Sequence, residues 1–373
     1  MKTPGLYIHI PFCKSKCHYC GFYSVTSLDQ IPDFLGALFI EMEMYRKEWG
    51  PMDTVYIGGG TPSVLSEKNL RDLLRKVREN FNLLPDSEIT LEANPGDLDL
   101  SFLRFLKEIG VNRLNIGIQS FDPKLLDFLG RRHTLREAVS AIEASRKAGF
   151  ENIGMDLIYG VPGQGVHPWL ETLSQALVFS PEHLSCYQLT LEPGTPMEMR
   201  YRRNEVEFPE EEMEYVFFMK TAESLEDKGY VHYEVSNFAR SIEFASRHNQ
   251  KYWDHTPYLG LGPGAHSFLD GRRWWNFRSV DRYHKELWEG RFPVEETEIL
   301  TREQLRMEAL FLGLRKKSGI HLHDFAKQYQ WDLAVEKKAI LDQFQKEGLV
   351  SIRNGFLTPT RAGLALADRL SLL

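Results

Sequence analysis

Short runs of apolar and β-branched residues alternate with amphipathic helical stretches through the first half of the chain, and this alternation constrains the fold most. The runs expected to form strands are Leu6–Ile10, Thr54–Ile57, Glu88–Leu91, Arg113–Ile118, Asn152–Ile158 and His183–Leu191. Strands that alternate with helices pair in parallel, with the helices outside the sheet. Right-handed crossovers would curl six such units into most of a barrel, and an open doubly wound sheet is the alternative.

The pattern changes near Leu287, where helical stretches begin to follow one another. These stretches are Arg302–Leu314, His323–Gln328 and Leu333–Glu347. Two short strands then flank Asn354-Gly355, a pair typical of a tight hairpin turn. Three helices and a hairpin predict a winged-helix-like unit, and a small helical cap is the alternative. A length of 373 residues also favours two domains, which we expect at 1–286 and 287–373.

The charge balance excludes some classes of partner. The chain carries 45 Lys+Arg against 52 Asp+Glu, a net charge of −7, so it lacks the basic field of a general nucleic-acid binder. No apolar run is long enough to span a bilayer, and Met1–Ile10 lacks the apolar core and cleavage site of a secretory signal. We therefore expect a cytoplasmic protein with no membrane insertion.

Three cysteines, Cys13, Cys17 and Cys20, follow the first predicted strand with C-x3-C-x2-C spacing. Thiolates bind iron and zinc, and clustered thiols in a cytosolic chain indicate a metal rather than disulfides. A loop of this spacing can place three sulfurs at three corners of an iron–sulfur cubane. Such clusters usually take four cysteines, so the fourth iron would stay open to a small molecule.

The alternative is a zinc ion with His18 or His9 as the fourth ligand. Structural zinc sites usually combine two separated pairs of ligands, and the chain has no second pair of cysteines. Cys186 stands alone on a predicted inner strand, where we interpret it as a small buried side chain rather than a ligand.

The segment Tyr-Ile-His-Ile-Pro-Phe-Cys that ends at Cys13, with the two cysteines after it, resembles the start of the oxygen-independent coproporphyrinogen III oxidase family of radical-SAM proteins. The resemblance extends along nearly the whole chain. It implies a partial (β/α)6 barrel, a 4Fe–4S cluster, and S-adenosylmethionine bound through its amino and carboxylate groups to the open iron. The reduced cluster of the family cleaves the sulfonium to a 5′-deoxyadenosyl radical.

Polar residues at the ends of successive predicted strands agree with such a ligand. Gly58–Pro62 (Gly-Gly-Gly-Thr-Pro) follows the second strand, Glu92 and Gln119 close the next two, Asp156 lies in the fifth, and Arg131 follows the fourth. Glycines permit close approach of the backbone to a ligand, and the carboxyl ends of barrel strands meet at one mouth. The resemblance carries the adenosylmethionine contacts of the family onto Tyr7, Tyr19, Gly59, Gly60, Thr61, Glu92, Gln119, Arg131, Asp156, Thr190 and His266.

Two departures separate the chain from the true oxidases of that family. The oxidases carry a further cysteine two positions after the third, where this chain has Phe22. They also have an N-terminal extension that helps to enclose the porphyrinogen, whereas about five residues precede the first strand here. We therefore expect no coproporphyrinogen III oxidase activity.

His248-Asn249-Gln-Lys-Tyr252-Trp253 resembles the HNxxYW signature of the HemW branch of the family. Members of that branch bind haem and are implicated in delivering it to respiratory proteins. Imidazole is a common axial ligand of haem iron, and aromatic rings can stack on the macrocycle. A buried histidine beside an Asn turn and a core tryptophan is the structural alternative.

Three functions follow from these features. The favoured one is a haem chaperone on a radical-SAM scaffold, with haem and respiratory haemoproteins as partners and peripheral contact with the membrane. The others are a coproporphyrinogen III dehydrogenase and a radical-SAM enzyme with an unrelated substrate. The sequence leaves open the oligomeric state, a homodimer included, and the identity of the haem acceptor.

Overall fold

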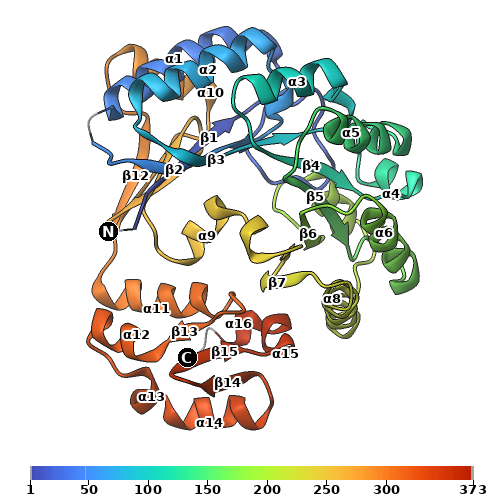
Figure 1. Ribbon diagram of the computed structural model, residues 1–373, viewed down its shortest axis with the longest axis vertical. Helices are drawn as coiled ribbons and strands as arrows, with labels where there is room; N and C mark the ends of the chain where they lie inside the picture. The colour runs from blue at the N-terminus through green and yellow to red at the C-terminus, as the bar shows by residue number, and fades with distance from the viewer. Residues whose placement is uncertain (1, 47, 371–373) are drawn as a thin grey trace.

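The computed structural model describes residues 2–46 and 48–370, which form a large curved sheet with helices outside it and a smaller C-terminal unit (Figure 1). Six parallel strands form the centre of the sheet: β1 (Gly5–Ile10), β2 (Met52–Gly59), β3 (Leu83–Ala93), β4 (Arg113–Gln119), β5 (Ile153–Tyr159) and β6 (His183–Gln188). They are neighbours in chain order. This order confirms the partial barrel, because a doubly wound sheet would reverse its strand order partway.

Further strands extend both edges of this six-stranded core. Beside β1 lie β9 (Tyr258–Leu261), β10 (His266–Leu269), β11 (Arg272–Asn276) and β12 (Val294–Ile299), and beside β6 lie β8 (Asn237–Ala239) and β7 (Val231–Glu234). Only β9 in these extensions continues the parallel pairing, through β1. Within the described residues β6 pairs with β8 rather than with β1, so the barrel stays open along one side.

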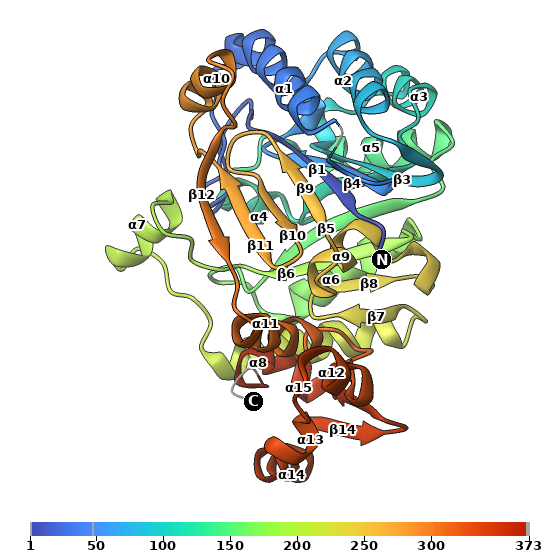
Figure 2. The ribbon, with the colours of Figure 1, turned by 90° about the vertical axis from the view of Figure 1, so that its left-hand side faces the viewer.

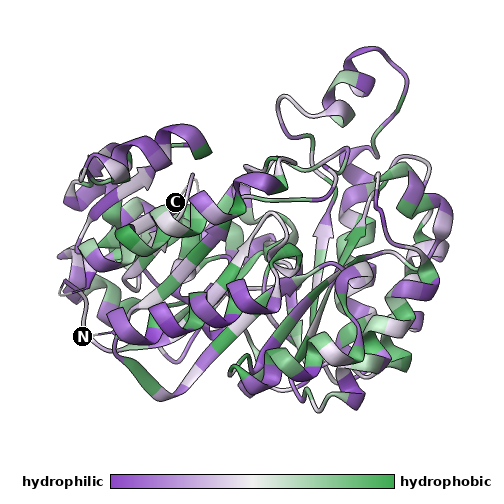
Figure 3. Cartoon of the chain, turned by 90° about the horizontal axis from the view of Figure 1, so that it is seen from above, coloured by the Kyte–Doolittle hydropathy of each residue, from purple (hydrophilic) through white to green (hydrophobic). Residues whose placement is uncertain are grey.

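Amphipathic helices cover the outer face of the sheet. They are α1 (Ile31–Tyr45), α2 (Glu67–Asn80), α3 (Leu100–Glu108), α4 (Pro123–Phe128), α5 (Leu135–Lys147), α6 (Val166–Val178), α8 (Glu211–Glu226) and α10 (Val280–Trp288). The side chains of Leu70, Leu73, Leu74 and Val77 in α2 are buried, as their spacing predicts. In the view from above, hydrophilic and hydrophobic residues alternate within individual helices, as in amphipathic helices (Figure 3). A short helix, α7 (Pro196–Arg202), projects from the body (Figure 2).

The helix α9 (Arg247–Trp253) lies between the barrel and the C-terminal unit (Figure 1). Its first residue, Arg247, forms an ion pair with Asp53 at the start of β2, and its backbone N–H donates to Glu88 at 3.2 Å. Asp53 is the second residue of β2, and Glu88 is paired in register with Thr54, the next residue of β2. The helix therefore closes the end of the barrel opposite to the strand ends at which polar residues were predicted to converge.

The C-terminal unit has its own hydrophobic core, formed by residues such as Leu310, Phe325 and Leu357. Its elements are α11 (Arg302–Gly313), β13 (Ile320–His321), α12 (Leu322–Tyr329), α13 (Leu333–Glu336), α14 (Lys338–Lys346), β14 (Val350–Arg353), β15 (Phe356–Pro359), α15 (Arg361–Ala365) and α16 (Ala367–Leu370). Helices with a β-hairpin confirm the winged-helix-like arrangement. Asn354 and Gly355 both have positive φ, 52° and 80°, as their hairpin turn requires.

Two details differ from the sequence-based expectation. The stretch Leu333–Glu347 forms two helices, because Lys337 leaves the helical conformation with φ −116° and ψ 22°. The expected boundary at residue 287 falls within α10, and β12 beyond it still pairs with β11. We therefore propose that the C-terminal unit begins after β12. In the part of the chain that the structure describes, no helix is long and apolar enough to cross a membrane.

Candidate cofactor site

The cysteines lie in a loop that follows β1 and is held from several sides. The N–H of Cys13 donates to the carbonyl of Val25 at 3.0 Å, and the N–H of His18 donates to the carbonyl of Leu129 at 3.1 Å. The carbonyl of His18 accepts from the N–H of Met197 at the start of α7. These contacts fix the loop against segments that are far apart in the sequence.

Two polar side chains approach the cysteine sulfurs. Thr61 Oγ1 donates to Cys13 Sγ at 3.4 Å, and Arg131 Nη1 donates to Cys17 Sγ at 3.4 Å. A hydroxyl and a guanidinium stabilise thiolates, the form that binds iron. Each thiolate of a cubane binds its own iron, so the sulfurs need not meet at one point. Among residues 2–46 and 48–370, no three side chains of His, Cys, Asp or Glu are arranged to hold one metal ion.

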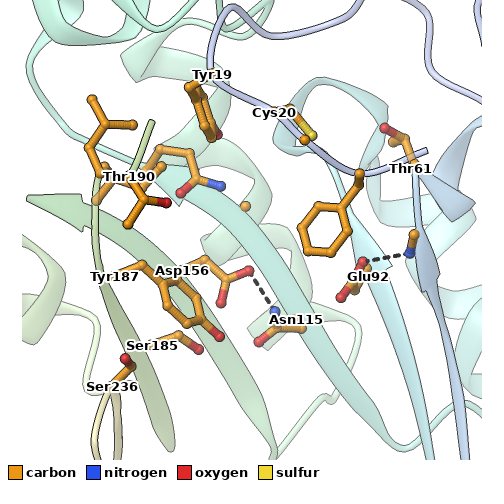
Figure 4. A pocket seen from close by; sticks show the side chains of 18 of the residues that line it. Tyr19, Cys20, Thr61, Glu92, Asn115, Asp156, Ser185, Tyr187, Thr190 and Ser236 are labelled. Atoms are coloured by element: carbon orange, nitrogen blue, oxygen red, sulfur yellow. Dashed lines mark hydrogen bonds between the residues drawn. The ribbon is translucent and has the colours of Figure 1, made fainter. Parts of the chain in front are cut away.

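A cavity of about 820 Å³ opens beneath this loop at the carboxyl ends of the strands (Figure 4). Its wall includes Cys20 and most of the side chains predicted from the sequence to contact adenosylmethionine. These are Tyr19, Gly59, Gly60, Thr61, Glu92, Gln119, Arg131, Asp156 and Thr190. The structure therefore brings together residues from all six parallel strands or the loops that follow them, as expected for the mouth of a parallel barrel.

Glu92 is the best-defined acidic group of the cavity. Tyr56 donates to its Oε1 at 2.7 Å, and the N–H of Gly59 donates to its Oε2 at 3.1 Å. Burial raises the pKa of Glu92 to about 7, and the nearby Asp156 carboxylate adds to the rise. A cationic ligand beside Glu92 would favour the ionised carboxylate and oppose the effect of burial.

Asp156 and Gln119 form the opposite part of the wall. Asn115 Nδ2 donates to Asp156 Oδ2 at 2.6 Å, and burial raises the pKa of Asp156. Asp156 Oδ1 and Gln119 Oε1 are buried without a hydrogen-bond partner among the described residues. Gln119 also has φ 65°, a strained value for a residue with a side chain, and such strain often occurs at ligand sites. Both groups offer acceptors to a polar ligand.

Gly59 and Gly60 hold the backbone close to the cysteine loop. Gly59 has φ 107°, and a Cβ there would lie 2.5 Å from His9 Nδ1. A Cβ at Gly60 would lie 2.7 Å from the carbonyl oxygen of Phe12, while the N–H of Gly60 donates to the carbonyl of Ile10. The glycines are therefore required by the loop itself, in addition to any ligand.

Two predicted contacts lie outside the cavity wall. Tyr7 lies on β1, where its hydroxyl pairs with His9 Nδ1 at 2.9 Å. His266 lies on β10 and stacks on Trp275, with 5.4 Å between ring centroids. Neither side chain is among those that line the cavity, so the predicted contact of each with adenosylmethionine gains no geometric support.

The HNxxYW segment forms α9, the short helix that its spacing suggested, but its histidine is not at a surface. The His248 side chain is buried, with Nδ1 2.9 Å from Thr54 Oγ1 and Nε2 2.9 Å from Tyr252 Oη. Burial, and secondarily Lys251, lowers its pKa to about 3. Because both ring nitrogens are engaged, His248 is not available to ligate haem iron in this conformation. Asn249 alone of the segment lines the cavity.

Sequence reasoning missed several polar side chains that complete the cavity wall. They are Tyr56, Asn115, His183, Ser185, Tyr187 and Ser236. His183, Ser185 and Tyr187 occupy alternate positions of β6, so one side of that strand faces the cavity. Polar residues at every second position of an otherwise apolar strand were the signal that could have identified them.

Comparison with known proteins agrees with this geometry. The model of the Radical SAM superfamily matches residues 7–176, and that of the HemN C-terminal domain matches residues 300–366. A solved structure of coproporphyrinogen III oxidase (HemN) from Escherichia coli has the same fold, with a TM-score of 0.86, 23% identity, and coverage of 100% of this chain and 89% of that chain.

Relatives named heme chaperone HemW match over most of the chain. The protein of Bacillus subtilis is 36% identical over 97% of this chain and 96% of its own length. The protein of Lactococcus lactis is 38% identical over 88% of this chain and 86% of its own length. The mitochondrial radical S-adenosyl methionine domain-containing protein 1 of Bos taurus is 34% identical over 99% and 86%. This chain therefore belongs to the HemW family of radical-SAM proteins.

Proposed function

We propose that this protein is a haem chaperone that binds haem and delivers it to respiratory haemoproteins. Relatives from several bacterial groups that carry the name heme chaperone match almost its whole length. Delivery to respiratory acceptors would bring the protein to the membrane surface by peripheral contact. The structural observation that supports the proposal is that the residue after the cysteine loop places an exposed aromatic ring at the mouth of the cavity.

That residue is Phe22, whose side chain is 67% exposed and lines the cavity mouth. An exposed phenylalanine ring offers a flat apolar surface for a planar apolar ligand such as haem. An enzyme that generates a radical on a porphyrinogen needs a site from which water is excluded. An exposed aromatic ring at the entrance suits reversible holding of haem better than enclosed turnover.

We propose that Cys13, Cys17 and Cys20 each bind one iron of a 4Fe–4S cluster. Thr61 and Arg131 support this assignment, because each donates a hydrogen bond to a cysteine sulfur. When bound, the cluster supplies the electron for reductive cleavage of adenosylmethionine. Thr61 and Arg131 would donate hydrogen bonds to the Cys13 and Cys17 sulfurs, and the backbone contacts of the loop keep it against the strand ends.

We propose that adenosylmethionine occupies the cavity beside the open iron. The acceptors Glu92, Gln119 and Asp156 suit its amino N–H and ribose hydroxyl groups, and Arg131 provides a donor, because its Nε is buried without a partner among the described residues. The sulfonium group is cationic, and two buried carboxylates with raised pKa values lie in the same wall. The charges of ligand and cavity are therefore complementary.

The second candidate function is a coproporphyrinogen III dehydrogenase. The observation in its favour is the close similarity of fold to the Escherichia coli enzyme. Similarity of fold alone does not carry an activity. A radical-SAM enzyme with an unrelated substrate is the third, and no side chain described above selects such a substrate.

Two assays on the anaerobically prepared holoprotein separate these functions. Haem added stoichiometrically should shift its absorption band as it binds. Coproporphyrinogen III with adenosylmethionine and a reductant should give no protoporphyrinogen. Decarboxylation with proportional consumption of adenosylmethionine would replace the chaperone by the dehydrogenase. Absence of both haem binding and decarboxylation would favour the third function.

A further inference from the structure

His266 differs from His248 in every property that matters for binding iron. Its side chain is exposed, and its imidazole has no hydrogen-bond partner among the described residues. Burial of part of the ring, with Arg273 and Arg278 nearby, lowers its pKa, so the imidazole is neutral at pH 7. Neutral imidazole is the form that ligates iron.

The sheet holds His266 on the face that turns away from α1. Trp274 donates to Tyr45 and Asn276 donates to Glu41, so these alternate residues of β11 point toward α1. Trp275 lies between them and therefore points to the opposite face. His266 is paired in register with Trp275. Figure 2 shows β10, β11 and β12 side by side at the front of that view.

Trp275 orients the imidazole. The two rings are stacked, with 5.4 Å between centroids and an interplanar angle of 25°. A stacked indole restricts rotation of the imidazole through its ring face and does not occupy either ring nitrogen. A ligand side chain that is held in this way loses less conformational entropy when it binds a metal.

Arg278 connects this histidine to the loop that bears the cysteines. Its Nη2 donates to the carbonyl of Gly21 at 2.9 Å, and its side chain packs against Gly264, two residues before His266. Phe22, the exposed residue at the cavity mouth, directly follows Gly21. One region therefore holds an imidazole, an exposed aromatic ring and a guanidinium.

The charges of this region also define an orientation for an anionic ligand. Arg273 is engaged by Glu308 and Glu298, whereas Arg278 has no carboxylate partner among the described residues. Glu296 lies opposite Trp275 on the edge strand β12. A carboxylate-bearing ligand would therefore turn its anionic side toward Arg278 and away from β12.

We propose that His266 is the axial ligand of haem iron, with Phe22 against the macrocycle and Arg278 paired with a propionate. This inference rests on the proposed function, since it names the site at which a haem chaperone would hold its cargo. It assigns to the HNxxYW segment a structural role, in which His248 joins α9 to the barrel strands through Thr54.

The test is a titration of the anaerobic holoprotein with ferric haem, followed by absorption and EPR spectroscopy. His266→Ala should remove the signature of imidazole ligation and weaken haem binding by about tenfold or more, because even outer-sphere partners of a metal ligand are typically worth 10- to 100-fold. Added imidazole should restore the signature in His266→Gly. Arg278→Gln should weaken binding without changing the iron spectrum.

Two controls keep the result specific to His266. His167→Ala removes another exposed histidine, on α6, and should leave haem binding unchanged. The response of the cluster EPR spectrum to adenosylmethionine should be retained in His266→Ala, because this residue lies outside the cavity wall. A His266→Ala protein that binds haem with unchanged affinity and spectrum would overturn the inference alone. A wild-type protein that binds no haem would overturn the proposed function together with it.

Discussion

Substitution of Glu92 by glutamine tests whether a buried carboxylate prepares the cavity for a cation. The side chain has part of its surface toward the cavity, and burial raises its pKa from 4.5 to about 7. For an acid, a raised pKa in the folded state means that the fold loses stability as pH rises from 4.5 to 7. At about 1.4 kcal/mol per pH unit, the ionised form costs up to about 3 kcal/mol above pH 7.

Glutamine has no proton to lose, so Glu92→Gln removes this dependence on pH. Between pH 5.5 and pH 8 the free energy of unfolding of the wild type should fall by about 2 kcal/mol relative to the variant. Water in the cavity screens the charge, which makes this figure an upper estimate. Urea denaturation at both pH values, of protein that carries its cluster but no adenosylmethionine, measures this change in the free energy of unfolding. The matched control is Glu212→Gln, on the exposed face of α8.

The same variant has the opposite effect on ligand affinity. Adenosylmethionine should bind the wild type more tightly as pH rises from 6 to 8, because ionised Glu92 pairs with a cation. The affinity of Glu92→Gln should be lower and should change less with pH over this range. If both proteins showed the same pH dependence of stability and of affinity, the reasoning about Glu92 would be refuted.

Two further predictions concern the cysteine loop. Replacement of any of its three cysteines by alanine should remove most of the iron and sulfide from anaerobically purified protein, whereas Cys186→Ala on β6 should retain both; zinc as the sole metal of the wild type would contradict the assignment. Gly60→Ala should destabilise the loop by about 1–3 kcal/mol and shorten the life of the cluster in air, because its Cβ meets backbone atoms of Phe12. Gly36→Ala in α1, where a Cβ meets no atom within 4 Å, is its control, and equal loss of cluster from both variants would count against the close approach.

Local patterns were enough to predict the barrel. The period-2 and period-3.6 patterns identified all six parallel strands, and Asn354-Gly355 identified the hairpin of the C-terminal unit. Crossover handedness then arranges parallel strands in sequence. The convergence of Glu92, Gln119 and Asp156 on one cavity followed from their places at strand ends, because parallel strands bring their carboxyl ends to the same edge.

Tertiary packing decided what the sequence pattern left open. The motif containing His248 offered an imidazole and two aromatic rings, but motif chemistry does not reveal that Thr54 and Tyr252 occupy both ring nitrogens. Nor does it reveal that His266 stacks on Trp275, because that contact depends on the register between β10 and β11. Side-chain availability is a property of the folded neighbourhood and is not encoded in residue type or spacing.

The claim that this protein delivers haem is tested most directly by transfer. Holoprotein loaded with one equivalent of haem is mixed with a respiratory apo-cytochrome, and the absorption band of the reconstituted cytochrome is followed over time. If the protein delivers haem, the rate of transfer will increase with the concentration of acceptor and exceed the rate at which haem dissociates into a non-interacting scavenger. Transfer that is no faster than dissociation into the scavenger, at any concentration of acceptor, would contradict the chaperone function.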